Sequence, residues 1–142
     1  MSKSNNLETS ILALIFNATA IANVADNAAT APLTALFVSL HTADPGEAGT
    51  QATSEATYTG YARVSVARTS GGWAVAAGSC SPVATISFPA CTAGANTISF
   101  FGVGSAVSGV GSLFYSGTVT PNIAVSTGVT PQLATSSTIT ED

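Results

Sequence analysis

The single histidine of the chain lies close to two carboxylates: His41, Asp44 and Glu47 all fall within the stretch LHTADPGE. A histidine beside carboxylates is typical of general acid–base catalysis, and the same three side chains carry the donor atoms of a metal site. However, Pro45-Gly46 is a β-turn dipeptide, the spacing differs from that of a Ca²⁺-binding loop, and no G-x-S-x-G elbow supplies a nucleophile. We therefore predict that His41 ends a strand and that Asp44 accepts backbone N–H bonds in a turn. This interpretation assigns the protein no catalytic residue and no metal site.

The other residues with chemical potential are more scattered. Four further acids are Asp26, Glu55 and the adjacent pair Glu141 and Asp142, and these three positions are far apart in the sequence. A glycosidase needs two carboxylates close together in a cleft, which this spacing does not indicate. The Gly-Val-Gly segments at 102–104 and 109–111 lack the lysine of a phosphate-binding loop, so we predict no cofactor. Four aromatic residues fit either a sugar-stacking platform or, more commonly, core and interface anchors: Tyr58, Tyr61, Trp73 and Tyr115.

The scarcity of charge limits the possible partners. The chain has 142 residues, and only 7% of them are charged, against about 25% in a typical protein. The three basic residues, Lys3, Arg63 and Arg68, cannot form a basic patch, so binding to nucleic acid through its phosphates is excluded. Soluble monomers usually keep apart through mixed surface charge. We therefore expect one domain, residues 1–142, that spends much of its surface in contact with other protein.

Two cysteines, Cys80 and Cys91, flank the run SPVATISFPA. If that run is a strand, its ends lie roughly 20 Å apart at about 3.3 Å per residue, whereas a disulfide needs Cα atoms about 5.5 Å apart. The sequence therefore predicts two free, buried thiols, consistent with assembly in the cytoplasm.

The N-terminal segment, residues 1–31, is expected to hold one amphipathic helix and a linker. Asn5 and Glu8 have the spacing of a capping box, the helix should fade between residues 22 and 29, and Pro32 prevents it from continuing. Its apolar run is too short to span a bilayer. It also differs from a secretory signal, because Glu8 lies where such a signal is positively charged, and Asn17 and Thr19 interrupt the apolar stretch. We therefore expect no membrane partner. Five residues recur at helical spacing and form the predicted apolar stripe: Leu7, Ile11, Leu14, Ile15 and Ile21.

Residues 32–142 are predicted to form a β-sandwich. Short runs rich in β-branched and aromatic residues, separated by Gly, Pro, Ser and Asn, favour a sandwich or barrel of about eight strands, which would be jelly-roll-like. The longest connection, 42–60, is polar and is expected to be a contact-making loop. The predicted strands are residues 34–41, 61–69, 73–77, 83–88, 97–104, 112–118, 122–126 and 132–140.

The order of these segments resembles a family of small virion proteins of tailed bacteriophages. The resemblance covers nearly the whole chain, from SNNLETSILALIFNATA through ISFPACTAG, FFGVGSA and LFYSGTVT to STIT. Its more specific parts are LHTADPGE and GYAR, the latter within YTGYARVSVART. Members of the family are labelled either as tail-fibre-like proteins or as head cement and decoration proteins.

The resemblance implies a non-enzymatic structural protein of the virion, assembled in the host cytoplasm. Jelly-roll cement proteins, which clamp neighbouring major capsid subunits and stabilise the head, are the closest structural match, so the expected partners are the major capsid protein and further copies of the chain, as a dimer or trimer. The alternative is a tail-fibre or baseplate component that binds a receptor or glycan. Whether the helix packs on its own sheet or on a neighbour is left open. The candidate interface residues are Leu7, Ile11, Leu14, Ile15, Asp44, Glu47, Glu55 and Tyr58.

Overall fold

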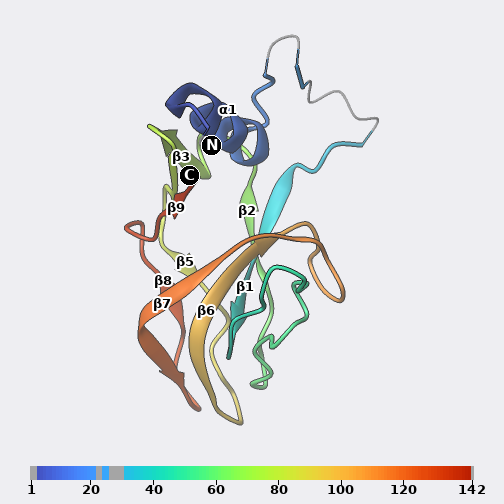
Figure 1. The fold of residues 1–142 in the computed structure, drawn as a ribbon. Helices are drawn as coiled ribbons and strands as arrows, with labels where there is room; N and C mark the ends of the chain where they lie inside the picture. Colours follow the sequence, from blue (N-terminus) through green and yellow to red (C-terminus); the bar gives the residue numbers. More distant parts are fainter. Residues whose placement is uncertain (1–2, 22–23, 26–30, 142) are drawn as a thin grey trace. The chain divides into compact units, whose positions relative to one another are not determined.

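The computed structural model describes residues 3–21, 24–25 and 31–141 (Figure 1). Most of the predicted linker at 22–29, together with Asp26 and Asp142, lies outside the described residues. The chain divides into two compact units: unit 1 comprises residues 1–35, 66–85 and 134–142, and unit 2 comprises residues 36–65 and 86–133. A single domain over residues 1–142 stays a prediction.

The fold is mainly β with one N-terminal helix, as predicted. The described part of the chain contains one helix and nine strands: α1 (Asn5–Asn17), β1 (Ala35–His41), β2 (Val64–Ala67), β3 (Trp73–Ala76), β4 (Ser79–Pro82), β5 (Ile86–Ser87), β6 (Asn96–Gly104), β7 (Leu113–Val125), β8 (Gln132–Leu133) and β9 (Ile139–Thr140). They form sheets of four strands (β2-β1-β6-β7), three strands (β3-β4-β9) and two strands (β5-β8). The finer jelly-roll-like assignment stays a prediction. No helix among the described residues is long and apolar enough to cross a membrane.

Helix α1 of unit 1 begins one residue earlier than the predicted capping box. Ser4, not Asn5, is the N-cap, and its hydroxyl accepts a hydrogen bond from the backbone N–H of Leu7. The helix ends at Asn17, because Ala18 turns the backbone into the left-handed region with φ of 54°. Ser4 is the better cap here because its φ and ψ are extended, which lets its side chain reach the first turn.

The buried face of α1 differs from the predicted stripe. Leu12 and Phe16, four residues apart, are completely buried, and the Phe16 ring packs edge-on against Trp73 of β3 with 4.8 Å between ring centroids. The stripe predicted from Leu7 to Ile15 is instead partly exposed. This helix has apolar residues on several sides, so the spacing alone did not indicate which side would face the sheet. The packing settles that α1 contacts the β3-β4 hairpin of its own unit through Phe16 and Trp73.

Unit 1 has two further local features, a hairpin turn and an arginine at the end of α1. The β3-β4 hairpin turns through Ala77 and Gly78, both with positive φ, as a two-residue type I′ turn requires. Arg68 donates hydrogen bonds to the backbone oxygens of Leu14 and Ile15 in the last turn of α1. A cation at the C-terminal end of a helix interacts favourably with the negative pole of the helix dipole. Burial lowers the pKa of the Arg68 guanidinium.

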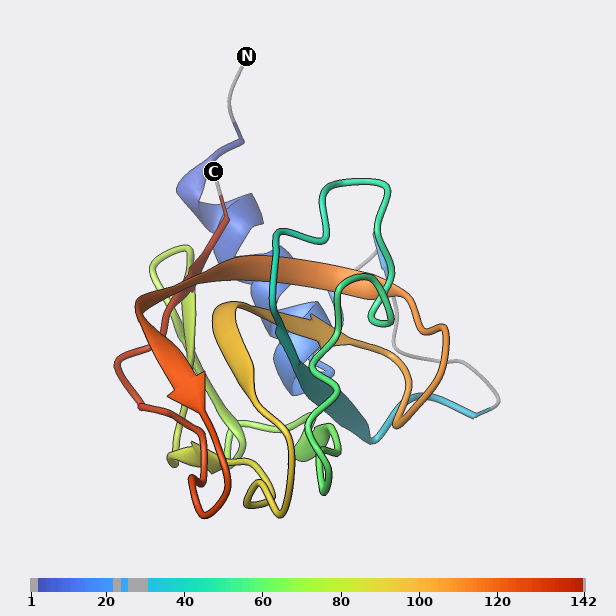
Figure 2. The ribbon, with the colours of Figure 1, turned by 90° about the horizontal axis from the view of Figure 1, so that it is seen from below.

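Unit 2 is built around the antiparallel pairs β1–β6 and β6–β7 (Figure 2). Phe37 to His41 of β1 lie opposite Gly104 to Phe100 of β6, so the strand ending in the histidine pairs with the FFGVG segment. Strand β7 pairs with the other side of β6, but the register shifts twice: the partner residues jump from Leu113 to Tyr115 and from Thr118 to Ile123. Strand β2 crosses the boundary between the two units.

Several predicted strands differ from the structure. The predicted strand 83–88 is wrong in part: SCSP forms β4, and only Ile86–Ser87 of the predicted run is strand β5. The two strands predicted at 112–118 and 122–126 form one strand, β7, because the chain continues through the bulge. The strand predicted at 132–140 is reduced to the two short strands β8 and β9. The two cysteines are nevertheless free and buried, as predicted.

Candidate functional site

His41 is a structural residue at the end of β1, as the sequence predicted. Its side chain is completely buried, with Nδ1 2.8 Å from the backbone oxygen of Thr53 and Nε2 2.8 Å from the hydroxyl of Ser39. A carbonyl only accepts hydrogen bonds, so Nδ1 carries the proton and Nε2 accepts from Ser39. Burial lowers the pKa of His41, which favours this neutral form. With both nitrogens engaged, the ring fixes the polar loop to the strand.

Gln51 fastens the same loop at a second point. Its side chain is completely buried; Nε2 donates to the backbone oxygen of Phe37, and Oε1 accepts from the backbone N–H of Ala106. The amide lies against Gly104 and Gly111, where an added Cβ would come closer than 3.0 Å to Gln51 atoms. Gly104 and Gly111 therefore leave the space that the buried Gln51 side chain occupies. We call these two residues the glycine floor.

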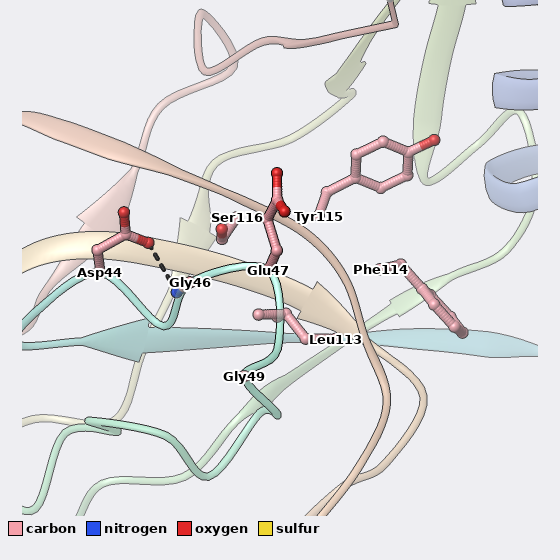
Figure 3. A pocket seen from close by; sticks show the side chains of 8 residues that line it. All are labelled: Asp44, Gly46, Glu47, Gly49, Leu113, Phe114, Tyr115 and Ser116. Carbon is pink, nitrogen blue, oxygen red and sulfur yellow. Dashed lines mark hydrogen bonds between the residues drawn. The ribbon is translucent and has the colours of Figure 1, made fainter.

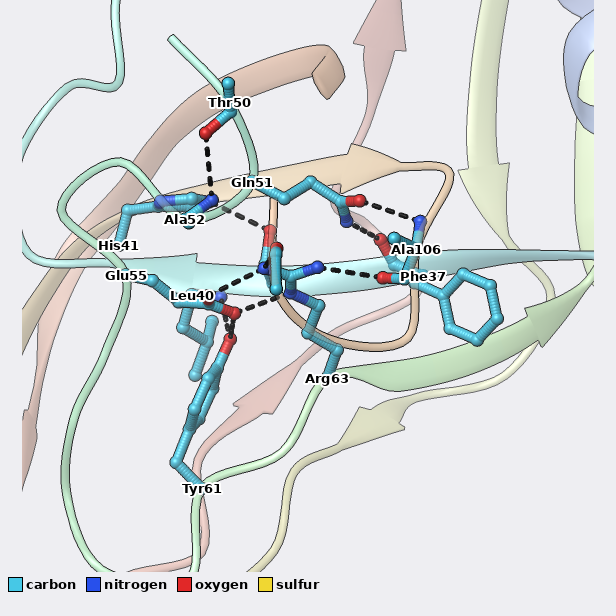
Figure 4. A network of polar contacts seen from close by, with 12 residues as sticks. Phe37, Leu40, His41, Thr50, Gln51, Ala52, Glu55, Tyr61, Arg63 and Ala106 are labelled. Atoms are coloured by element: carbon cyan, nitrogen blue, oxygen red, sulfur yellow. Dashed lines mark hydrogen bonds and ion pairs between the residues drawn. The ribbon is translucent and has the colours of Figure 1, made fainter. Parts of the chain in front are cut away.

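The third attachment is an ion pair between Glu55 and Arg63. Arg63 Nε and Nη2 lie 2.6 and 2.7 Å from the two carboxylate oxygens of Glu55, and the Arg63 side chain is 1% exposed (Figure 4). Two further N–H groups of the guanidinium, on Nη1 and Nη2, donate to the backbone oxygens of Ala106 and Gly109. Tyr61 donates to Glu55 and accepts from the backbone N–H of Leu40. The hydrogen bonds to Glu55 raise the pKa of Arg63.

Two of the predicted interface residues belong to this interior. The Glu55 carboxylate is occupied by Arg63 and Tyr61, and Tyr58 is only 3% exposed, with its hydroxyl donating to the backbone oxygen of Pro89. Tyr58 therefore presents almost no surface to a partner, and the Glu55 side chain is only 18% exposed. The sequence missed the ion pair because its members stand eight residues apart across a loop, which is no recognisable spacing. The GYAR motif of the resemblance was the one available signal, since it contains Tyr61 and Arg63.

Asp44 and Glu47 lie instead at the surface, on one wall of a groove. Asp44 Oδ1 accepts the backbone N–H of Gly46 at 2.9 Å, and Gly46 has φ of 70°, which confirms the predicted turn. The opposite wall is the first part of β7, residues 113–116 (Figure 3). The groove has a volume of about 380 Å³ and combines two carboxylates with Phe114, which is 42% exposed. Nothing in the sequence indicated that β7 would lie beside this turn.

The groove also holds the exposed charge of unit 2. Within residues 36–65 and 86–133, all of which the structure describes, the acidic and basic residues are Asp44, Glu47, Glu55 and Arg63. Because Glu55 and Arg63 neutralise each other, the remaining charge belongs to Asp44 and Glu47. The described residues contain no cluster of three His, Cys, Asp or Glu side chains that could hold a metal. What the groove offers is an acidic contact surface with an aromatic rim.

The other interface candidates lie on α1 in unit 1. Leu7 is 40% exposed, and the others are half-buried: Ile11, Leu14 and Ile15. Their apolar surface is available to a partner in part, and their role as contacts stays a prediction.

Comparison with known proteins assigns the family. A family model described as podophage GP4 fiber I protein gp80 matches residues 2–140. No curated protein matches the chain significantly. The match covers nearly the whole sequence, including both units and every residue of the groove. The chain therefore belongs to the podophage GP4 fiber I protein gp80 family and is a structural protein of a phage virion.

Proposed function

We propose that this protein is a fibre subunit of a podophage tail and works as a contact surface. The observation that carries the proposal is the family match over residues 2–140, whose description names a fiber protein. The tail-fibre alternative is therefore preferred to the capsid-cement role. The family description does not support the cement role. That role would require the major capsid protein as a partner.

The structure of unit 2 is consistent with a contact function. The segment 42–60, polar and long, is fastened to the sheet by His41, Gln51 and the Glu55–Arg63 pair, so its surface is ordered before any partner binds. Association costs less when the binding surface is already rigid. The wall of the groove formed by Asp44 and Glu47 thus has a defined shape in the free protein.

We also propose that the protein is a homo-oligomer, a dimer or trimer, in the fibre. The net charge of −4 on 142 residues is small, so repulsion between copies is weak. Analytical ultracentrifugation of the purified chain over a concentration series tests this directly. A single sedimenting species with the mass of one chain at all concentrations would contradict it.

Immunogold labelling of purified virions tests the position in the particle. Antibodies against the purified chain should label the tail, and virions that lack the protein should adsorb poorly to host cells while their heads resist heat as before. Label spread over the head, together with heads that rupture at lower temperature, would overturn the fibre assignment and favour the cement role. A control in which the gene is restored in trans shows that both effects come from this chain.

A further inference from the structure

Strand β7 is an edge of the four-stranded sheet, since the strand order is β2-β1-β6-β7. On one side, Leu113 and residues 115–118 pair with residues 100–104 of β6, and a register shift skips Phe114. None of the described strands pairs with the other side of β7. Backbone N–H and C=O groups of alternate residues in a strand point to opposite sides. About half of the backbone groups of residues 113, 114 and 116–118 therefore face outward, where no described strand pairs with them.

This edge has little of the usual protection against strand pairing. Proteins block exposed edges with charged side chains, prolines or bulges. Strand β7 has no charged residue, and its proline, Pro121, lies after Thr118. One of its two register shifts, opposite Ile98 and Phe100, also lies after Thr118, whereas the other skips Phe114 near the start of the strand. Residues 113–118 thus form an uncharged edge without proline, regular from Tyr115 onward, of the kind to which extended peptides add as a further strand.

The acidic groove runs beside this edge. Four successive residues of β7, from Leu113 to Ser116, line the groove, and the turn at 44–49 forms the opposite wall (Figure 3). A peptide that added to β7 would therefore pass the carboxylates of Asp44 and Glu47. The exposed ring of Phe114 would offer it an apolar contact.

The charge distribution favours one kind of occupant. A second copy of β7, paired edge to edge, would bring two further carboxylates to the interface, and the single cation of unit 2, Arg63, is buried with Glu55. Like charges that face each other across strands are destabilising. A strand with lysine or arginine side chains would instead meet opposite charge at Asp44 and Glu47. Complementary charge also increases the rate of encounter.

We propose that the β7 edge and the 44–49 turn form a docking site for an extended, basic segment of another protein. The segment adds to the sheet beside β7, with backbone hydrogen bonds to residues 113–118 and basic side chains against Asp44 and Glu47. The inference deepens the proposed function and rests on it for the source of the segment, which is another protein of the virion.

A strand-forming peptide tests the site with the full chain. The probe is a fluorescent peptide of about nine residues in which lysine alternates with threonine, and its binding is followed by fluorescence anisotropy at low salt. Two further peptides carry N-methyl groups on alternate residues, in opposite phase. A strand that adds to one edge uses the N–H groups of one phase only. One methylated peptide should therefore lose binding at least tenfold, and the other should bind like the parent.

Substitutions in the turn test the contribution of charge. Asp44→Asn with Glu47→Gln preserves the shape of the turn, because the side-chain oxygen of an asparagine at this position can still accept the N–H of Gly46. The double variant should bind the lysine peptide about fivefold to tenfold more weakly, as expected for two exposed ion pairs. Glu141→Gln, in unit 1, is the matched control and should leave binding unchanged. A peptide with glutamate in place of lysine should bind the unmodified chain at least tenfold more weakly.

Three results would overturn the inference. These are no binding of the lysine peptide at millimolar concentration, equal loss with both methylated peptides, or equal binding of the lysine and glutamate peptides. Self-pairing through β7 would also contradict it, and would appear as a dimer that the double substitution Asp44→Asn, Glu47→Gln strengthens. These results are distinguishable from a failure of the fibre assignment, since labelling of the head would leave peptide binding unaffected.

Discussion

Replacement of Arg63 by methionine should destabilise unit 2 more than any surface substitution in the same loop. Methionine fills a similar length of space but removes the guanidinium, which makes four hydrogen bonds to Glu55, Ala106 and Gly109. In the variant, the Glu55 carboxylate keeps the hydrogen bond from Tyr61 but loses both bonds from Arg63. The backbone oxygens of Ala106 and Gly109 lose their charged donor.

The size of the effect follows from burial. Loss of one member of a buried ion pair costs about 3–5 kcal/mol, because the other charge stays desolvated. Glu55 is 18% exposed on its side chain, so water can reach it in the variant. We therefore expect the lower end of that range, about 3 kcal/mol of unfolding free energy, from a total that is typically about 5–15 kcal/mol. Arg63→Lys keeps the charge but loses the planar fork and should cost about half as much.

Urea unfolding followed by far-ultraviolet circular dichroism measures this loss, and amide hydrogen exchange locates it. The N–H of Ala106, which donates to Gln51, should exchange faster in Arg63→Met, because the 105–111 segment loses its attachment to the guanidinium. Glu47→Gln, an exposed carboxylate of the same loop, is the control and should change stability by less than about 0.5 kcal/mol. A loss below about 1 kcal/mol in Arg63→Met, with unchanged exchange at Ala106, would refute the role assigned to the ion pair.

Three further outcomes are expected. Gly104→Ala should cost about 2–3 kcal/mol of unfolding free energy, since its Cβ would collide with Gln51 and with backbone atoms. Gly46→Ala has open space around it and should cost only about 1 kcal/mol, because of the positive φ at this position. Equal costs of the two variants in urea unfolding would argue against the glycine floor. Because burial lowers the pKa of His41, the unfolded state takes up the proton at a higher pH than the folded state does. The contribution of His41 to the unfolding free energy is therefore unchanged well above pH 6.5 and should decrease as the pH falls below about 6.5. His41→Asn should remove this part of the dependence of stability on pH, and an unchanged dependence would contradict the buried, neutral state assigned to His41. Burial raises the pKa of Cys80 to about 12, so a thiol reagent at about pH 8 should modify it in denatured but not in native protein, as mass spectrometry would show.

Much of the local structure was predictable because it depends on short-range chemistry. His41 ends its strand and Asp44 begins a turn, since a Pro-Gly pair and an acceptor two residues before Gly46 determine the backbone there. The mainly β class followed from the short β-branched runs between glycines and prolines. Strand β4 was missed because SCSP has serines and a proline, which are poor strand formers; its pairing with β3 and β9 overrides that preference.

The site was predictable only in part. Asp44 and Glu47 were proposed as contact residues, but the other wall of the groove comes from β7, almost seventy residues later in the chain. No local pattern links these segments, because their proximity depends on the way β7 pairs with β6. For the same reason Glu55 was predicted as a candidate interface residue and not as an ion-pair partner: Arg63 is buried by the packing of two loops, and neither loop shows this in its composition.

The glycine floor has a consequence for how sequences of this family vary. Gln51 occupies the space that side chains at Gly104 and Gly111 would need, although these positions lie more than fifty residues away in the chain. A family member with alanine or serine at either glycine must make room, and a shorter residue at position 51 is the simplest way to do so. Positions 51, 104 and 111 should therefore change together, with their combined side-chain volume nearly constant, while the exposed residues of the 42–60 loop change independently.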